Sequence, residues 1–300
     1  MSLPSNLSAW TKQLVKQYNL RPGRHLGQHF LVDALVLANI IKVAELSPEV
    51  PVLEVGSGLG VLTLSLLEKE ARVVAVELDV VLAAALQKIA IASRNLTVIK
   101  SDILKLSDYD LQQALGLRAG DSYSVVANLP YEISGAFLRR FLSGSLRPRI
   151  MVLLLQAEVA NRLTARPGQV SLLTLQAWSA AEVKIIKIVK PSAFYPPPRV
   201  NSAIVKFKLY SDDKRAELFR GINEDWFWQL AKAGFSARRK YLLNNLERQL
   251  SFSKPDLLAV FNKIGLPEKI RAQELTLEQW LDLAWKLNGK AGPEHLNPKS

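Results

Sequence analysis

The segment 53–60 (LEVGSGLG) constrains the fold of this chain more than any other stretch. Residues 52–55 are mostly apolar and suit a buried strand, and residues 61–67 are amphipathic, as in a helix. Glycines at alternate positions allow a tight turn and leave room for a ligand, and the helix start offers free N–H groups. Because the spacing is not the Gly-x-Gly-x-x-Gly of pyrophosphate sites, the segment fits either a nucleotide-like cofactor or a plain tight turn.

Polar residues stand at the ends of three further predicted strands, which cover residues 72–77, 96–99 and 124–127. Glu77 ends the first, Asp102 follows the second and Asn128 follows the third. Since the carboxyl ends of parallel strands meet at one edge of a sheet, we expect these side chains to form one site. An acid at the place of Glu77 accepts hydrogen bonds from ribose hydroxyls in doubly wound sheets. The alternative for Glu77 is a neighbour of a helix N-cap.

Alternating strands and helices over residues 52–155 predict an α/β fold, a Rossmann-like sheet with helices on both faces. Strand-like segments at 171–178, 183–189 and 202–209 extend the sheet. We therefore expect residues 1–210 to form one domain, with segment 1–50 folding over the cofactor. The purely helical spacing that follows predicts a small all-α C-terminal domain over 211–300.

The charge and the residue types narrow the possible partners. A net charge of +12 over 300 residues favours a polyanion, nucleic acid before a membrane surface. The chain has no cysteine and its three histidines lack ligand spacing, so neither disulfides nor a metal site are expected. Without a membrane-length apolar run or a signal-peptide pattern, the expected location is the cytoplasm.

The loop 128–131 (NLPY) suits an exocyclic amine on a flat base. The amide oxygen of Asn128 and the carbonyl of Leu129 can accept its two N–H bonds, Pro130 stiffens the turn, and Tyr131 offers a stacking face worth about 1–3 kcal/mol. Two fixed acceptors stabilise the positive charge that develops when such a weak nucleophile attacks a sulfonium methyl group. No catalytic His, Cys or Ser is then needed. A structural turn with a buried tyrosine is the alternative.

Further candidates lie on both sides of the strands. Gln28 and His29 precede the first strand and could line the pocket, and Phe194 stands close before three prolines that stiffen a connection. Core packing is the alternative for Phe194. Two basic groups suit RNA phosphates or a solvated surface: Arg139, Arg140, Arg147 and Arg149 after the NLPY loop, and Arg238, Arg239 and Lys240 in the helical region.

Motifs along almost the whole chain resemble the ribosomal RNA adenine N6-dimethyltransferases. The first group comprises 28–31 (QHFL), 54–60 (EVGSGLG), 76–79 (VELD), 101–102 (SD) and 127–134 (ANLPYEIS). The second group resembles the KsgA (RsmA) branch in particular and comprises 156–162 (QAEVANR), 194–203 (FYPPPRVNSA), 235–240 (FSARRK) and 271–275 (RAQEL). Two departures stand out: His29 replaces a usual Asn, and the stretch 169–172 is shortened and lacks a Tyr-Gly-Arg element.

The resemblance implies a class I methyltransferase fold, S-adenosylmethionine as methyl donor, and dimethylation of two adjacent adenosines near the 3′ end of small-subunit (16S) rRNA during subunit biogenesis. It implies a monomer that acts on rRNA within the ribosomal particle, without metal or membrane. The implied donor-binding residues are Gln28, His29, Leu31, Gly56, Gly58, Glu77, Leu78, Asp102, Ile103 and Asn128. Asn128 would also bridge donor and target base, with Tyr131 stacking on the target and Phe194 as a second face. The cluster Arg238, Arg239 and Lys240 would contact RNA.

Three rival functions follow from the same residues. A resistance methylase acting on large-subunit (23S) rRNA shares the site, and the proline run and FSARRK segment favour the small-subunit branch. A non-catalytic RNA-binding assembly factor is opposed by the intact Glu77, Asp102 and NLPY loop. A dinucleotide-dependent oxidoreductase is opposed by the glycine spacing.

Overall fold

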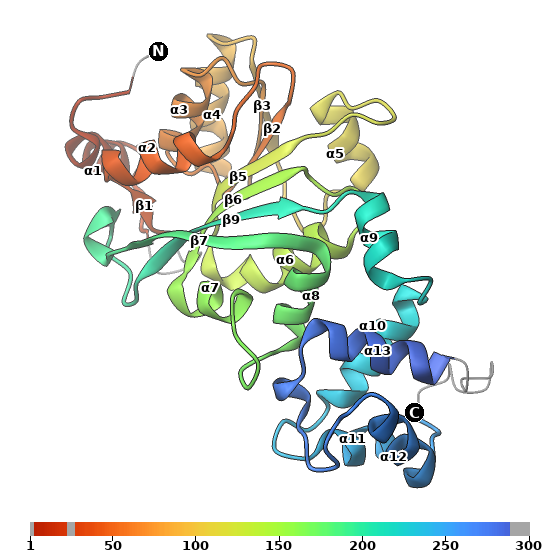
Figure 1. Ribbon diagram of the computed structural model, residues 1–300. Coiled ribbons are helices and arrows are strands. Elements are labelled where there is room, and N and C mark those ends of the chain that lie inside the picture. Colours follow the sequence, from red (N-terminus) through yellow and green to blue (C-terminus); the bar gives the residue numbers. More distant parts are fainter. Residues whose placement is uncertain (1–2, 23–27, 289–300) are drawn as a thin grey trace. The chain divides into compact units, whose positions relative to one another are not determined.

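The computed structural model describes residues 3–22 and 28–288, which form two units (Figure 1). The sheet unit contains the residues up to 161 and residues 181–209, and the helical unit contains residues 162–180 and those from 210 onward. No helix among the described ranges is long and apolar enough to cross a membrane.

The sheet unit is built on seven strands in the order β4-β3-β2-β5-β6-β9-β7. They are β2 (Val52–Val55), β3 (Val73–Glu77), β4 (Leu96–Lys100), β5 (Ser124–Asn128), β6 (Ile150–Gln156), β7 (Ala181–Val189) and β9 (Ser202–Leu209). Strands β2 to β6 pair in parallel, and β9 and β7 pair antiparallel at one end. The strand order reverses between β2 and β5, which is where open α/β sheets bind ligands. The Rossmann-like prediction is confirmed.

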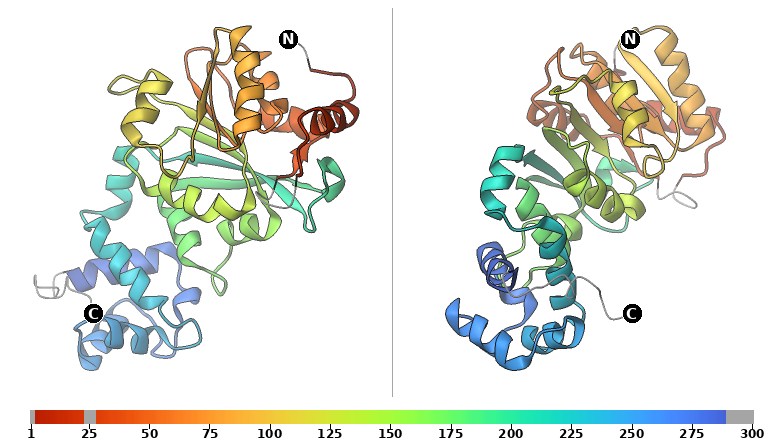
Figure 2. Two further views of the ribbon diagram at one scale, coloured as in Figure 1. Left: turned by 180° about the vertical axis from the view of Figure 1, so that it is seen from behind. Right: turned by 90° about the vertical axis from the view of Figure 1, so that its right-hand side faces the viewer.

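Helices cover both faces of the parallel part of the sheet (Figure 2). They are α1 (Leu7–Gln17), α2 (Ala34–Val43), α3 (Val61–Leu67), α4 (Val80–Ile91), α5 (Asp108–Leu115), α6 (Ser134–Ser143) and α7 (Ala157–Leu163). On one face, Leu37 of α2, Leu66 of α3 and Ile204 of β9 belong to a single buried apolar cluster. Two short strands, β1 (Phe30–Leu31) and β8 (Phe194–Tyr195), pair antiparallel beside the main sheet.

The helical unit has its own core. Its helices are α8 (Leu172–Ala180), α9 (Asp212–Phe219), α10 (Glu224–Gly234), α11 (Leu242–Gln249), α12 (Lys254–Lys263) and α13 (Leu277–Asn288). Trp226 of α10, Trp280 of α13 and Leu175 of α8 are at most 2% exposed and share one cluster. The side chain of Asn223 caps α10 by accepting the Trp226 N–H at 3.1 Å.

The prediction of a strand over 171–178 is wrong, because these residues begin helix α8. Ser171 and Thr174 exchange backbone-to-side-chain hydrogen bonds of 3.0 and 3.2 Å, a reciprocal N-terminal cap. The helix is buried on almost every side, so its sequence lacks the polar stripe that reveals an amphipathic helix. The change of unit after residue 209 lies next to the expected boundary, but segment 162–180 was expected in the first domain and lies in the helical unit.

Candidate active site

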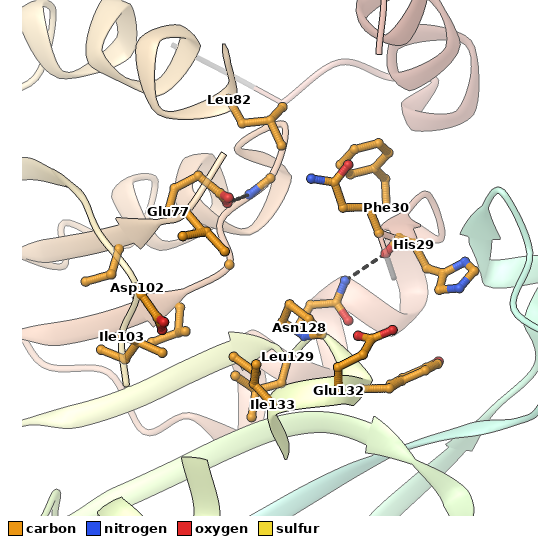
Figure 3. A pocket seen from close by; sticks show the side chains of 18 of the residues that line it. His29, Phe30, Glu77, Leu82, Asp102, Ile103, Asn128, Leu129, Glu132 and Ile133 are labelled. Carbon is orange, nitrogen blue, oxygen red and sulfur yellow. Dashed lines mark hydrogen bonds between the residues drawn. The ribbon is translucent and has the colours of Figure 1, made fainter. Parts of the chain in front are cut away.

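A cavity opens at the carboxyl ends of β2, β3 and β5 (Figure 3). It holds about 1000 Å³ of empty space, including the part open to solvent. Its lining includes these predicted residues: Gln28, His29, Gly56, Gly58, Glu77, Leu78, Asp102, Ile103, Asn128, Leu129, Pro130 and Tyr131. Strand ends far apart in the sequence therefore meet at one place, as the polar residues after each strand predict.

Glu77 ties the end of β3 to the glycine turn. Its side chain accepts the Gly58 N–H at 2.8 Å through Oε2 and the Asp79 N–H at 2.9 Å through Oε1. Burial raises the pKa of this carboxyl group, partly offset by these N–H donors. A carboxylate has about four acceptor positions, so Glu77 can still accept hydrogen bonds from a ligand in the cavity.

The glycines of the turn allow neighbouring residues of the protein, as well as a ligand, to approach the backbone closely. Gly56 and Gly58 have positive φ angles of 69° and 56°, which side chains disfavour. A Cβ atom on Gly56 would stand 3.1 Å from Cδ of Pro130, and one on Gly58 would stand 3.2 Å from the Phe30 ring. The turn therefore brings the NLPY loop and the residue after His29 close to β2.

Asn128 is held by the backbone of the N-terminal segment. Its Nδ2 donates to the carbonyl oxygen of His29 at 3.0 Å (Figure 3). This bond fixes which end of the amide is the nitrogen and leaves Oδ1 as an acceptor for the cavity. Leu129 follows with a fully buried side chain, 2% exposed.

Tyr131 is fixed from two sides at the rim of the cavity. Its hydroxyl is 2.7 Å from the Oγ of Ser202, the first residue of β9. The ring centroid lies 5.8 Å from that of His29, with the planes tilted by 31°. The Nδ1 of His29 is in turn 2.7 Å from the carbonyl oxygen of Pro196. Burial raises the pKa of Tyr131, so its hydroxyl stays protonated.

Asp102 and Ile103 follow strand β4, next to the end of β3 where Glu77 stands (Figure 3). Oδ1 of Asp102 accepts the Leu104 N–H at 2.9 Å, which leaves Oδ2 for a donor from the cavity, as far as the described residues go. Arg140 donates to the carbonyl oxygen of Ile103 and forms a 2.8 Å ion pair with Asp108. Arg140 thus supports the cavity wall, and its side chain is only 18% exposed.

A second buried carboxyl group lies beneath the glycine turn. Glu54 is 1% exposed, and its Oε2 accepts a hydrogen bond from Oγ1 of Thr63 at 2.6 Å. Burial raises the pKa of Glu54 to about 8, against the opposing effect of the hydrogen bond from Thr63. Glu54 is therefore mostly neutral at pH 7.

Two predicted residues do not line the cavity. Leu31 and Phe194 are paired across β1 and β8 and are 5% and 4% exposed within an apolar cluster. The surroundings of Phe194 agree with the alternative prediction for this residue, which is packing in the core. The cluster Arg238, Arg239 and Lys240 belongs to the helical unit and is exposed, with Nε of Arg238 donating to Gln273 at 3.2 Å.

Some contributing residues escaped the sequence analysis. Phe30, Leu82 and Ile133 add apolar surface to the cavity lining, and Ser202 supports Tyr131. Phe30 and Ser202 lie inside the motifs that resemble the dimethyltransferase family, so the sequence carried a signal for both residues. Leu82 is one of several similar apolar residues in α4, and nothing in the sequence separates it from them. Among the described residues, no group of three or more His, Asp or Glu side chains could hold a metal ion.

Comparisons with known proteins identify the family. Residues 20–288 match the family described as ribosomal RNA adenine dimethylase. A protein of Dehalococcoides mccartyi named ribosomal RNA small subunit methyltransferase A is 42% identical over 92% of this chain and 91% of its own length.

Two solved structures extend the comparison. A dimethyladenosine transferase from Plasmodium falciparum has a TM-score of 0.71 and 26% identity over 87% of this chain and 98% of its own. The 23S rRNA methyltransferase ErmE has a TM-score of 0.63 and 25% identity over 86% and 99%. Because the family match spans nearly the whole chain, the protein belongs to the ribosomal RNA adenine dimethylase family.

Proposed function

We propose that this protein is a small-subunit rRNA adenine N6-dimethyltransferase that takes methyl groups from S-adenosylmethionine. The substrate would be two adjacent adenosines near the 3′ end of 16S rRNA in an assembling particle, with the enzyme acting as a monomer in the cytoplasm. The relative from Dehalococcoides mccartyi is named ribosomal RNA small subunit methyltransferase A, which supports the small subunit as the target. The observation that carries the chemistry is the amide of Asn128, fixed by the His29 carbonyl with its oxygen free for an amine.

The cavity residues fit S-adenosylmethionine. A buried acid that still has acceptor capacity, Glu77, would hold the ribose hydroxyls, and Asp102 would accept the adenine amino group. Leu78 and Ile103 would flank the purine, and the open backbone of Gly56 would face the methionine part. Gln28, His29 and Gly58 line the same cavity. When bound, the donor supplies an electrophilic methyl group on a sulfonium centre.

The NLPY loop would prepare the target amine. Oδ1 of Asn128 and the carbonyl of Leu129 would accept its two N–H bonds and stabilise the positive charge that develops on nitrogen. Tyr131, held by Ser202, would stack on the base. These residues position and polarise the amine and do not abstract a proton during transfer. The exposed cluster of Arg238, Arg239 and Lys240 would contact RNA phosphates.

The test is transfer of labelled methyl groups from S-adenosylmethionine to unmodified small ribosomal subunits, with large-subunit RNA alongside. We expect two adjacent dimethyladenosines in small-subunit rRNA. Label in large-subunit RNA alone would assign the protein to the resistance methylases. Binding of subunits without any label would instead support a non-catalytic assembly factor.

A further inference from the structure

The positive charge of this chain is concentrated in one stretch. Residues 133–210 contain 12 of the 39 lysines and arginines but only two of the 27 acidic residues, Glu158 and Glu182. Residues 1–132 hold 12 basic and 13 acidic residues, so their charges almost cancel. Most of the net charge of +12 therefore comes from a stretch whose basic residues lie mainly in the sheet unit.

Strand register gathers four of these lysines on one side of the sheet. Lys184 of β7 is paired with Lys206 of β9, and Lys187 is paired with Ile204. Cross-strand partners and residues two apart along a strand point to the same face. Lys184, Lys187, Lys206 and Lys208 consequently share one face at the end of the sheet, and we refer to them as the lysine face.

The lysine face is open and only partly neutralised. Lys184 is 66% exposed in its side chain and pairs with Glu182 at 2.6 Å. Lys206 is the most covered of the four and pairs with Glu45. Lys187 and Lys208 are exposed. Lys208 pairs across the strands with Glu182, and its charge helps to lower the pKa of Glu182 and Glu45.

Protection of a sheet edge does not account for this pattern. Strand β7 is the free edge, and lysines on an edge strand discourage pairing with other chains. Lys206 and Lys208, however, lie on β9, which is paired on both sides by β6 and β7. Side chains of mixed charge would also keep this face in water, whereas a surplus of lysines adds attraction for a polyanion.

Strand β9 connects the lysine face with the candidate active site. Strand β9 begins at Ser202, whose Oγ is 2.7 Å from the hydroxyl of Tyr131. At roughly 3.3 Å per residue, Lys206 and Lys208 lie about 13 and 20 Å farther along the strand. Ile204, which lies between Ser202 and these lysines on the same face of β9, is buried, and Lys208 pairs with Ile150, the first residue of β6. The lysine face therefore lies toward the opposite end of β6 from the cavity, and RNA bound there would lie at least about 13 Å from a base at Tyr131.

We propose that Lys184, Lys187, Lys206 and Lys208 form a surface that binds the phosphate backbone of the substrate RNA about 13 to 20 Å from the target adenosines. This inference rests on the proposed function and adds a second contact region within the sheet unit. Phosphate contacts of this kind position the RNA and carry no base specificity.

The test compares two triple variants of the full chain. Lys184→Gln/Lys187→Gln/Lys208→Gln removes the exposed charges and spares Lys206. The matched control Lys42→Gln/Lys69→Gln/Arg94→Gln removes three exposed charges from the balanced stretch. Affinity for unmodified small subunits is measured over a range of salt concentrations, together with transfer kinetics, binding of S-adenosylmethionine and binding to anionic phospholipid vesicles.

We expect the lysine-face variant to bind subunits about tenfold more weakly near 0.15 M salt, with a log–log salt slope shallower by about two. Its kcat at saturating subunits and its donor affinity should equal those of the control. Equal subunit binding by the two variants would overturn the proposal, as would lost vesicle binding with unchanged RNA binding, which points to a membrane. A wild-type protein that labels no rRNA would contradict the proposed function instead.

Discussion

At the level of single residues, the backbone of position 29 orients Asn128, and its side chain does not. The amide of Asn128 is held by the backbone carbonyl of residue 29, which every amino acid supplies. The imidazole of His29 has a separate task, since its Nδ1 lies 2.7 Å from the carbonyl of Pro196. The hydrogen bond that holds Asn128 therefore does not depend on which side chain stands at position 29.

Asn128→Ala should abolish methyl transfer and leave RNA binding largely intact. The substitution removes one of two fixed acceptors for the amine, and loss of a comparable transition-state contact costs about 100- to 1000-fold in rate. Single-turnover transfer and subunit binding, measured on the same preparation, check this. Equal loss of transfer and binding would refute the role given to Asn128.

Ser202→Ala should loosen Tyr131 without altering the donor site. The lost hydrogen bond is worth about 1 kcal/mol of folding stability, and kcat should fall while the affinity for S-adenosylmethionine stays unchanged. Ser202→Thr keeps the hydroxyl and should restore activity. In combination with Tyr131→Phe, which removes the same bond, the effects should not add. Additive losses would mean that Ser202 acts independently of Tyr131.

Glu54 should make the protein less stable as pH rises from about 5 to 8. Its folded pKa is about 8, above the ordinary 4.5, so the folded state retains a proton that the unfolded state releases. Stability is then highest below the unfolded pKa and falls by up to about 1.4 kcal/mol per pH unit until the folded pKa is passed. Glu77, whose pKa is also raised, adds to the same trend.

Glu54→Gln should flatten this dependence, because the amide keeps an acceptor for Thr63 and does not ionise. Denaturant unfolding at pH 5 and pH 8 measures the effect for both proteins. An unchanged pH dependence in the variant would show that other groups cause it.

At the level of secondary-structure elements, the glycine turn and the NLPY loop depend on each other. Gly56→Ala places a methyl group 3.1 Å from Pro130 and also strains a positive φ. Gly116→Ala is the matched control, because Gly116 has a similar φ of 66° and no atom within 4 Å of the added carbon. Both should lose about 1–2 kcal/mol of stability from backbone strain.

Only Gly56→Ala should displace the NLPY loop, and it should reduce the rate of methyl transfer by about tenfold or more. Transfer rates of the two variants, corrected for the folded fraction, make the comparison. Similar rates would mean that the contact with Pro130 is unimportant.

Whether an element could be predicted from the sequence depends on how it is buried in the fold. The strands of the parallel sheet are short apolar runs ending in polar residues, so their positions and the meeting of Glu77, Asp102 and Asn128 could be read directly. Helix α8 could not, because burial on nearly all sides removes its polar stripe. The tasks of Arg140 and Phe194 depend on distant partners, Asp108 and Leu31, which no local pattern reveals.

At the level of the whole molecule, the helical unit is discontinuous in sequence. Segment 162–180 leaves the sheet unit within the last two residues of α7, and the chain re-enters the sheet unit at β7. Its apolar residues, among them Val170 and Leu175, are 1% and 0% exposed in the core of the helical unit. The helical unit therefore needs a piece that the chain supplies before the sheet is complete.

From this discontinuity we predict which fragments of the chain fold without aggregating. A fragment of residues 1–210 retains α8 without its partners, leaving Val170 and Leu175 exposed, and should aggregate. A fragment in which residues 1–161 are joined to 181–209 by a short glycine–serine linker omits that segment but keeps every residue of the cavity. It should remain monomeric and bind S-adenosylmethionine like the full chain. Size-exclusion chromatography and calorimetry compare the two, and a monomeric 1–210 fragment would show that α8 does not depend on the helical core.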